Sequence, residues 1–309
     1  MPSAPHPPHL SIVVTVVGGA VAVRRLLAAL DRQVGAPPMQ VLVPWDDTVG
    51  EVGLLAPSWP AVTFLPLGAL PTAAPAGSAA AQHERFDRRR CAGLTAATGS
   101  LVAILEDRAP PRPEWAAAMA RLHAALPHAA VGGAIECGPD LSLLNWAYYA
   151  CDFGRFGPPF APGPRAWISD VNVCYKRRAV EATRDVWTPR FHEPAVHWRL
   201  LEQGETLFLS PDPVVEYSAD YQGLGRLLPE RYHWGRLFGA IRARHAPPPR
   251  RLALLAAAPF LPLLLLARHA RTQTARGHAG RFAAALPWLL PMLVAWSAGE
   301  AVGTWSRRP

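Results

Sequence analysis

Short apolar runs alternate with amphipathic stretches through the first part of the chain. The runs are rich in β-branched residues, as is typical of strands buried on both faces of a parallel sheet. They cover residues 10–17, 39–43, 62–65 and 101–105. Two stretches between and after them have apolar residues at helical spacing, one starting at Val23 and one that includes Trp115. Strand and helix in alternation predict an open α/β sheet.

The second half of this domain is less regular, but it contains further strand and helix patterns. Residues 129–135 and 168–175 are apolar runs, and a helix is expected to begin near Glu193 and to end at Gly204. Two short strands, 206–209 and 213–217, then close the domain. We expect residues 1–9 to be disordered, 10–220 to form the α/β domain, and 221–250 to be an amphipathic basic connector to the tail.

The tail, residues 251–309, is apolar and basic. From Arg226 to the end there are thirteen arginines and two acidic residues, in a chain whose net charge is +8. This pattern favours an anionic membrane surface as partner, and no motif indicates nucleic acid. The first apolar run, 252–267, has 16 residues with two prolines, which is marginal for a spanning helix. Helices that lie in one leaflet fit better than two spans.

Two pairs of acidic residues follow predicted strands. Asp46 and Asp47 follow the second strand, and Glu106 and Asp107 follow the strand at 101–105. Ligands of open parallel sheets bind beyond the carboxyl ends of the strands, where such groups suit a ribose or a cation on a diphosphate. Helix caps or solvated turns explain the pairs equally well. The four cysteines show no metal-binding or disulfide spacing.

The order of these segments resembles the inverting family 2 glycosyltransferases, which have the Rossmann-like GT-A fold. The matching segments are SIVVTVV, VLVPWDD, RFDRRRCAGLTAATGSLVAILEDRAPPRPEW, ISDVNVCYKRRAV and FHEPAVHWRLLEQGETLFLSPDPVV. The resemblance covers about residues 10–220. It implies a nucleotide-binding half at 10–107 and an acceptor half at 108–220. The fold class expected is therefore a GT-A mixed sheet flanked by helices, with an apolar helical membrane tail.

The resemblance also implies roles for individual residues. Asp46 or Asp47 would hold the nucleoside, with Arg90 and Arg108 also on the donor side. Glu106 and Asp107 would lie at the diphosphate and a divalent metal, Mn²⁺ or Mg²⁺. Glu193 would be the catalytic base, and Asn172 and Tyr175 would lie on the acceptor side. Arg108 and Pro194 depart from the family pattern, which commonly has carboxylates there, so metal dependence and activity are open.

The function implied is transfer of a single sugar, with inversion, from a nucleotide-sugar donor. The acceptor would be a lipid-linked or cell-envelope glycan at the cytoplasmic face of the inner membrane. The alternative is a weak or inactive relative that binds nucleotide-sugar and acts as a membrane scaffold. A dinucleotide-dependent enzyme is disfavoured because no G-x-G-x-x-G follows the first strand.

Overall fold

The structure of the protein is a computed structural model that describes residues 9–139, 141–188 and 190–308. The disordered segment expected at 1–9 therefore lies, apart from His9, outside the described residues. The chain divides into two compact units. The sheet unit holds the described residues up to Ala73, Gln82–Glu136 and Pro158–Tyr217. The helical unit holds Ala74–Ala81, Cys137–Gly157 and Ser218 to the end of the described chain.

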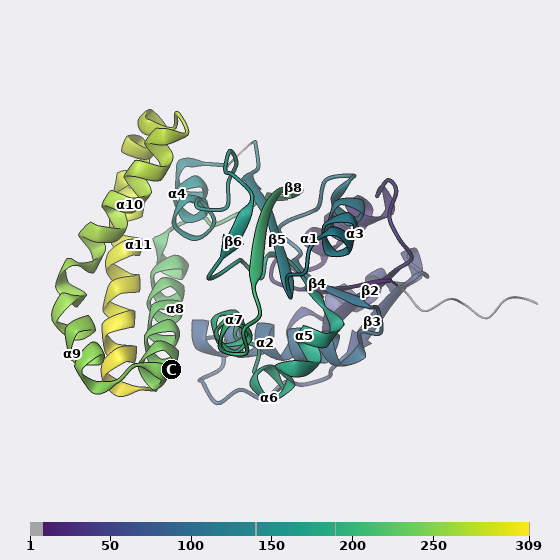
Figure 1. Cartoon of the computed structure of the whole chain (residues 1–309), viewed down its shortest axis with the longest axis horizontal. Helices are drawn as coiled ribbons and strands as arrows, with labels where there is room; N and C mark the ends of the chain where they lie inside the picture. The colour runs from purple at the N-terminus through teal and green to yellow at the C-terminus, as the bar shows by residue number, and fades with distance from the viewer. Residues whose placement is uncertain (1–8, 140, 189, 309) are drawn as a thin grey trace, which may run out of the picture. The chain divides into compact units, whose positions relative to one another are not determined.

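The sheet unit is built on one eight-stranded mixed sheet, which confirms the α/β prediction (Figure 1). The strand order is β3-β2-β1-β4-β7-β5-β8-β6. The strands are β1 (Leu10–Thr15), β2 (Met39–Trp45), β3 (Val62–Pro66), β4 (Leu101–Glu106), β5 (Ala130–Cys137), β6 (Gly163–Arg165), β7 (Asn172–Lys176) and β8 (Leu207–Tyr217). The two strands predicted at 206–209 and 213–217 are thus one strand, β8. The two prolines within β8 do not interrupt the strand.

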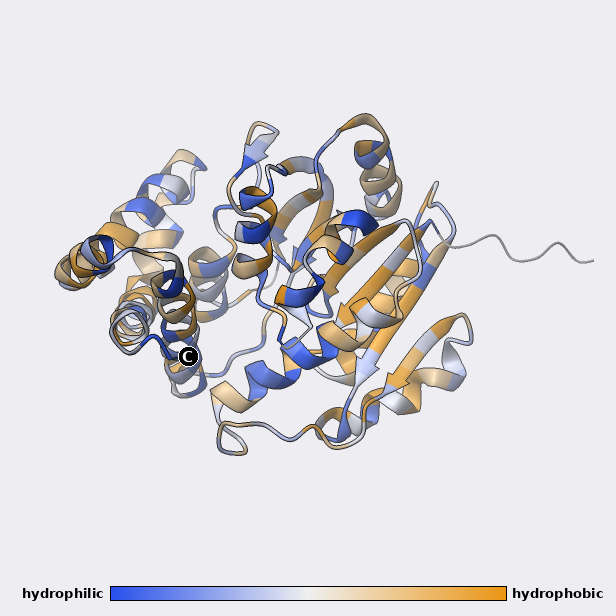
Figure 2. Ribbon diagram, turned by 60° about the horizontal axis from the view of Figure 1, so that its bottom comes forward, coloured by the Kyte–Doolittle hydropathy of each residue, from blue (hydrophilic) through white to orange (hydrophobic). Residues whose placement is uncertain are grey.

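The parallel half of the sheet follows from the apolar runs. Every residue of β1 and β4 is buried, and strands of the sheet are coloured mainly as hydrophobic in Figure 2. They pair in parallel with Thr15 opposite Glu106, so their carboxyl ends lie side by side. Helix α2 (Ala79–Ala96) packs closely on this sheet, because a Cβ at Gly93 would lie 2.3 Å from Val13 Cγ1.

The antiparallel strand β7 brings a later segment to the same edge. It pairs with β4 with Asn172 opposite Leu105, so the start of β7 lies beside the end of β4. The segment just before β7 is therefore placed at the carboxyl edge of the parallel strands. The other helices of the sheet unit are α1 (Ala20–Asp31), η1 (Asp47–Ser58), α3 (Trp115–Ala125), α5 (Arg177–Ala182), α6 (Arg184–Trp187) and α7 (Glu193–Glu202).

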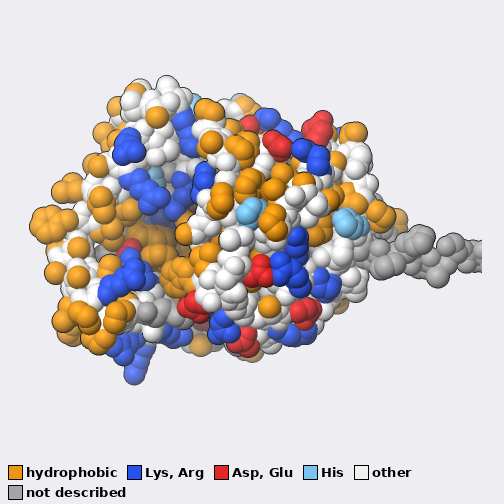
Figure 3. All heavy atoms as spheres, in the orientation of Figure 1, with side chains coloured by type: hydrophobic (Ala, Val, Ile, Leu, Met, Phe, Trp, Pro, Cys, Tyr) orange, Lys and Arg blue, Asp and Glu red, His pale blue; other side chains and the backbone are white. Residues whose placement is uncertain are grey.

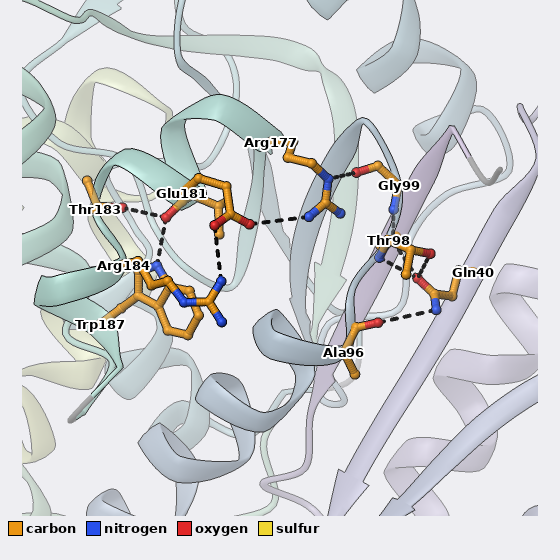
Figure 4. Close-up of polar contacts among 11 residues, drawn as sticks. Gln40, Ala96, Thr98, Gly99, Arg177, Glu181, Thr183, Arg184 and Trp187 are labelled. Atoms are coloured by element: carbon orange, nitrogen blue, oxygen red, sulfur yellow. Dashed lines mark hydrogen bonds and ion pairs between the residues drawn. The ribbon is translucent and has the colours of Figure 1, made fainter.

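At the other end of the strands, near the start of β4, the side chain of Arg177 forms polar contacts (Figure 4). Arg177 is the residue after β7. Its Nε donates to the Gly99 carbonyl at 2.6 Å, and its guanidinium lies 3.5 Å from the Glu181 carboxylate. The same end is tied by Gln40, whose side-chain oxygen accepts from Thr98 N and Oγ1. Arg177 thus joins α5 to the loop before β4, away from the acidic pairs.

The helical unit consists of α4 (Leu143–Asp152), α8 (Leu224–His245), α9 (Pro248–Ala257), η2 (Ala258–Phe260), α10 (Leu261–Ala275) and α11 (Ala279–Ser306). Two of its stretches, Pro248–Ala275 and Ala279–Ser306, are long and apolar enough to cross or anchor in a membrane. The residues expected to form a connector, 221–250, mostly belong to the long helix α8. Hydrophobic side chains gather over α9 and α10, with arginines among them (Figure 3).

Candidate functional site

The predicted acidic residues gather at the carboxyl edge of the parallel strands, within the sheet unit. Asp46 follows β2, Glu106 ends β4, and Asp107 comes next. The β1 end is tied to this group, because Asp107 N donates to the Thr15 carbonyl at 3.1 Å. The strand ends therefore bring together residues that are about sixty positions apart in the sequence.

Asp46 is a buried structural carboxylate. It accepts from Thr48 N at 2.8 Å as the N-cap of η1, and it pairs with Arg89 at 2.6 Å. Burial acts to raise its pKa, but the Thr48 hydrogen bonds and the Arg89 charge outweigh this and hold the pKa below its ordinary value. Arg89 also donates to the Val16 carbonyl, so the pair joins β2, α2 and the end of β1. Asp47, beside it, is exposed.

Glu106 and Asp107 have a different electrostatic setting. Burial raises the pKa of Glu106 to about 8 and that of Asp107 to about 6, although the Arg108 charge opposes both shifts. Asp107 accepts from Val17 N at 3.0 Å and from Gly18 N at 2.9 Å, which fixes the loop after β1. A Cβ on Gly18 would lie 3.4 Å from Arg108 Nε, so Arg108 packs over this loop. Glu106 is therefore mostly protonated at neutral pH.

Arg90 is the buried cation around which the rest of the site is arranged. It pairs with Asp170 at 2.8 Å and with Asp87 at 3.4 Å, and its Nε donates to Thr15 Oγ1 at 3.1 Å. Burial acts to lower its pKa, but the charges of Asp170 and Asp87, with those of Glu106 and Glu193, raise it. Arg90 is therefore a permanent positive charge among several carboxyl groups.

Glu193 begins α7 and lies against Asp170. Its pKa is raised well above the ordinary value, first by burial and then by the negative charge of Asp170 and a hydrogen bond between the two side chains. Its Oε1 is buried, and the described residues give it no hydrogen-bond partner. Two carboxyl groups this close cannot both ionise easily, so burial and the Asp170 charge together favour the neutral form of Glu193.

Tyr175 and Asn172, both on β7, differ in what they contact. Tyr175 lies close enough to Glu193 and Asp170 that, after burial, their charges raise its pKa well above the ordinary value. Its hydroxyl lies 2.9 Å from His197 Nε2, and burial lowers the pKa of His197 to about 3, so that the imidazole is neutral. The side chain of Asn172 forms its hydrogen bonds with other groups inside the fold. It accepts from Trp115 Nε1 and donates to the carbonyls of Ala134 and Pro213.

Sequence reasoning missed two carboxylates of this site. Asp170 is two residues before Asn172, and Asp87 is three residues before Arg90 on α2. Asp87 pairs with Arg90 and Arg190, and burial raises its pKa to about 6 against the pull of these two charges. Asp87 could have been found from its i, i+3 spacing to Arg90. Asp170 could not, because its position depends on the pairing of β7 with β4.

Glu106 and Asp107, the residues expected to hold a divalent metal, lie next to each other at the end of β4. Asp107 already accepts from two backbone amides, and the Arg108 cation lies beside both side chains. Within residues 9–139, 141–188 and 190–308, no group of three or more His, Cys, Asp or Glu side chains could hold an ion.

The fold and the site together define a class: an α/β protein with a buried cluster of arginines and carboxyl groups at the carboxyl edge of a mixed sheet. No protein-family model matches the chain, and no curated protein matches it either. The geometry of the site is therefore the basis for assigning its function.

Proposed function

We propose that the protein is an inverting glycosyltransferase of the GT-A type that transfers one sugar from a nucleotide-sugar donor. The observation that carries the proposal is the Glu193–Asp170 pair, held by Arg90 at the edge where β4 ends in Glu106 and Asp107. Ligands bind beyond such strand ends in open α/β sheets. A buried carboxyl pair with a raised pKa at this edge suits proton transfer from an acceptor hydroxyl.

Glu193 and Asp170 act as the base in this mechanism. Together they hold one negative charge, so the pair can accept one proton when an acceptor hydroxyl attacks the anomeric carbon. The oxygen–carbon bond to the acceptor forms as the bond to the nucleoside diphosphate breaks, from the opposite face, which gives inversion. Oε1 of Glu193 is the oxygen available for this contact, since it is buried and has no partner among the described residues.

The negative charge on the leaving diphosphate needs a positive partner. Arg108 is suited to this role, because it packs over Gly18 at the loop after β1 and remains charged at all physiological pH values. A neutral Glu106 repels the diphosphate less than an ionised one would. Asp47, exposed beside the buried Asp46–Arg89 pair, is the better placed of the two aspartates to accept from a nucleoside hydroxyl.

The acceptor that we propose is a lipid-linked or cell-envelope glycan at the cytoplasmic face of the membrane. The support for it is the apolar surface of the helical unit, which would hold the protein where such acceptors are found. The second candidate is an inactive relative that binds nucleotide-sugar as a membrane scaffold. The feature in its favour is the raised pKa of Glu193, since a neutral carboxyl group is a poor base.

The test is binding and turnover by the purified full chain. Nucleoside diphosphates and their sugars are screened for a rise in melting temperature, since a ligand that binds the folded state stabilises it. Release of nucleoside diphosphate in the presence of a lipid-phosphate acceptor is then measured in EDTA and with Mn²⁺ or Mg²⁺. We expect binding, turnover and little loss in EDTA. Binding without turnover indicates the scaffold, complete loss in EDTA contradicts the role of Arg108, and no binding at all contradicts the proposal.

A further inference from the structure

The helical unit has an apolar surface that the protein does not cover. The most apolar window of Pro248–Ala275 is 0% buried, and that of Ala279–Ser306 is 39% buried. The most exposed large apolar side chains of this unit are Leu252, Phe260, Leu263, Leu264, Val294 and Trp305. They belong to the region of α9, α10 and α11 where hydrophobic side chains gather in Figure 3. Exposed apolar surface of this extent is unfavourable in water and is typical of an interaction site.

Helix α11 is bound to α8 by close approach of the two backbones. A Cβ on Gly235 would lie 2.1 Å from the Trp296 carbonyl oxygen, and one on Gly239 would lie 2.2 Å from that of Glu300. From the other helix, a Cβ on Gly303 would lie 1.9 Å from the Arg236 carbonyl oxygen. Any side chain at these positions would push the helices apart. The residue numbers at these contacts increase in the same direction along both helices, so α8 and α11 are parallel.

The helix α8 is strongly charged along this contact. The guanidinium of Arg231 lies 4.7 Å from the centre of the Trp296 ring, and Arg242 forms an ion pair with Glu300, the one acidic residue of α11. The charged residues of α8 are Arg226, Glu230, Arg231, Arg236, Arg242 and Arg244. The apolar part of α11 therefore cannot be placed in a membrane without its charged neighbour.

This contact decides between spanning the bilayer and lying in it. If α11 crossed the membrane, α8 would have to cross beside it, with its charges in the hydrocarbon. Each charge at the bilayer centre lowers the insertion equilibrium by about a hundredfold. A crossing without α8 would leave Glu300 without Arg242. If α11 lies parallel to the membrane plane, one side of it can face protein while another faces lipid. The charges of α8 then stay out of the hydrocarbon, and Glu300 keeps Arg242 as its partner.

We propose that the helical unit lies in a single leaflet of an anionic membrane, with α9, α10 and the exposed face of α11 among the lipids. Within the unit, α11 lies between α8 and the α9–α10 stretch, so α8 is kept apart from the apolar edge (Figure 1). The exposed arginines Arg250, Arg268 and Arg271 border the apolar run at both ends. They would contact anionic headgroups, which complement their charge.

The first experiment measures how much the exposed apolar side chains contribute to membrane binding. The full chain carrying Leu263→Glu and Leu264→Glu is compared with a Leu54→Glu variant, which changes a leucine of the sheet unit that is also exposed (80%, against 64% and 65%). Flotation with vesicles of phosphatidylglycerol and phosphatidylcholine should fall about tenfold or more for the double variant and remain unchanged for Leu54→Glu. Vesicles of phosphatidylcholine alone should bind the parent protein less. Equal loss in both variants, or no preference for anionic lipid, overturns the proposal.

The second experiment separates the leaflet position from a span. Single cysteines replace Gly280 and Arg308, near the two ends of α11, in a background of Cys91→Ser and Cys137→Ser; far-UV circular dichroism verifies folding. A membrane-impermeant maleimide should label both positions from the same side of sealed membrane vesicles. Labelling from opposite sides shows a span and contradicts the proposal. A protein that stays soluble as a dimer, with both positions protected without lipid, shows that a second copy covers the surface instead.

Discussion

The two units treat charge and apolar surface in opposite ways. In the sheet unit most of the large apolar side chains are inside, and several charged side chains are also inside, held in pairs such as Asp46–Arg89, whose side chains are 0% and 2% exposed. In the helical unit large apolar side chains such as Phe260 are outside, 69% exposed, while the pair of Arg242 and Glu300 ties two helices together. The proposed position of the helical unit among lipids would account for this contrast.

The contrast shows what a buried charge does in each unit. In the sheet unit, burial shifts the pKa of Glu106, Asp107 and Glu193 upward, and under the proposed function this prepares them for chemistry. In the helical unit a buried charge fixes which helices must stay together. The same kind of interaction thus serves a site in one unit and an assembly in the other. The following variants test this contrast.

The largest effect is expected at Glu193. Glu193→Gln removes the proton acceptor but keeps the shape of the side chain, so transfer should fall by about 10²–10⁴ while the fold is retained. The rate is measured as nucleoside diphosphate released per enzyme, and folding by circular dichroism. Glu202→Gln, at the exposed end of the same helix, is the matched control and should keep the parent rate. Parental turnover in Glu193→Gln would mean that the residue only begins the helix.

A large effect on stability is expected from Asp46→Asn. It leaves the Arg89 cation buried without its partner, which typically costs about 3–5 kcal/mol in the free energy of unfolding. Urea unfolding followed by tryptophan fluorescence measures the loss. The control is Asp212→Asn, which breaks the exposed pair with Arg121 and should cost about 0–1 kcal/mol. Similar losses in both variants would show that the buried Asp46–Arg89 pair contributes no more to the free energy of unfolding than an exposed pair.

A smaller loss is expected at the contact of α8 and α11. Gly303→Ala places a methyl group against the Arg236 carbonyl, so the helices must separate at a cost of about 1–3 kcal/mol. Gly280→Ala, near the start of α11, meets no atom within 4 Å and should be neutral or slightly stabilising. Thermal unfolding in lipid nanodiscs measures both. If Gly303→Ala matches Gly280→Ala, the close backbone contact does not hold the unit together.

The smallest change is a shift in pH dependence. The charge of Asp170 helps to raise the pKa of Glu193, so Asp170→Asn should lower that pKa. The base form then appears at lower pH, and the acidic limb of the profile of kcat/KM should move to lower pH. Asp87→Asn is the control, since it removes a carboxyl from Arg90 without touching Glu193, and its limb should move less. A limb that stays in place, or moves up in Asp170→Asn, would show that the two carboxyl groups do not share a proton.

Much of the sheet could be predicted from the sequence, because β1, β2 and β4 contain apolar runs, and acidic residues follow the runs of β2 and β4 directly. The acidic pairs were placed at the right edge for that reason. Asp170 was not predicted as a site residue, because only the antiparallel pairing of β7 with β4 brings it beside Arg90. The two Gly-x-x-x-Gly patterns at 235–239 and 299–303 are visible in the sequence, but their partners are sixty residues apart and become evident only when the helices are packed.

The helical unit is also discontinuous in the chain, and this affects the order in which the protein can fold. Helix α4 leaves the ribosome between strands β5 and β6, long before α11 is made. Yet Trp146 of α4 is buried, its ring lies 5.3 Å from the Arg281 guanidinium, and Arg281 also donates to the Leu141 carbonyl. During synthesis, the part of α4 that carries Trp146 therefore lacks these contacts until the last helix is made. A nascent chain that stalls before α11 would expose this face and become a target for chaperones, even though every strand of the sheet has already been made.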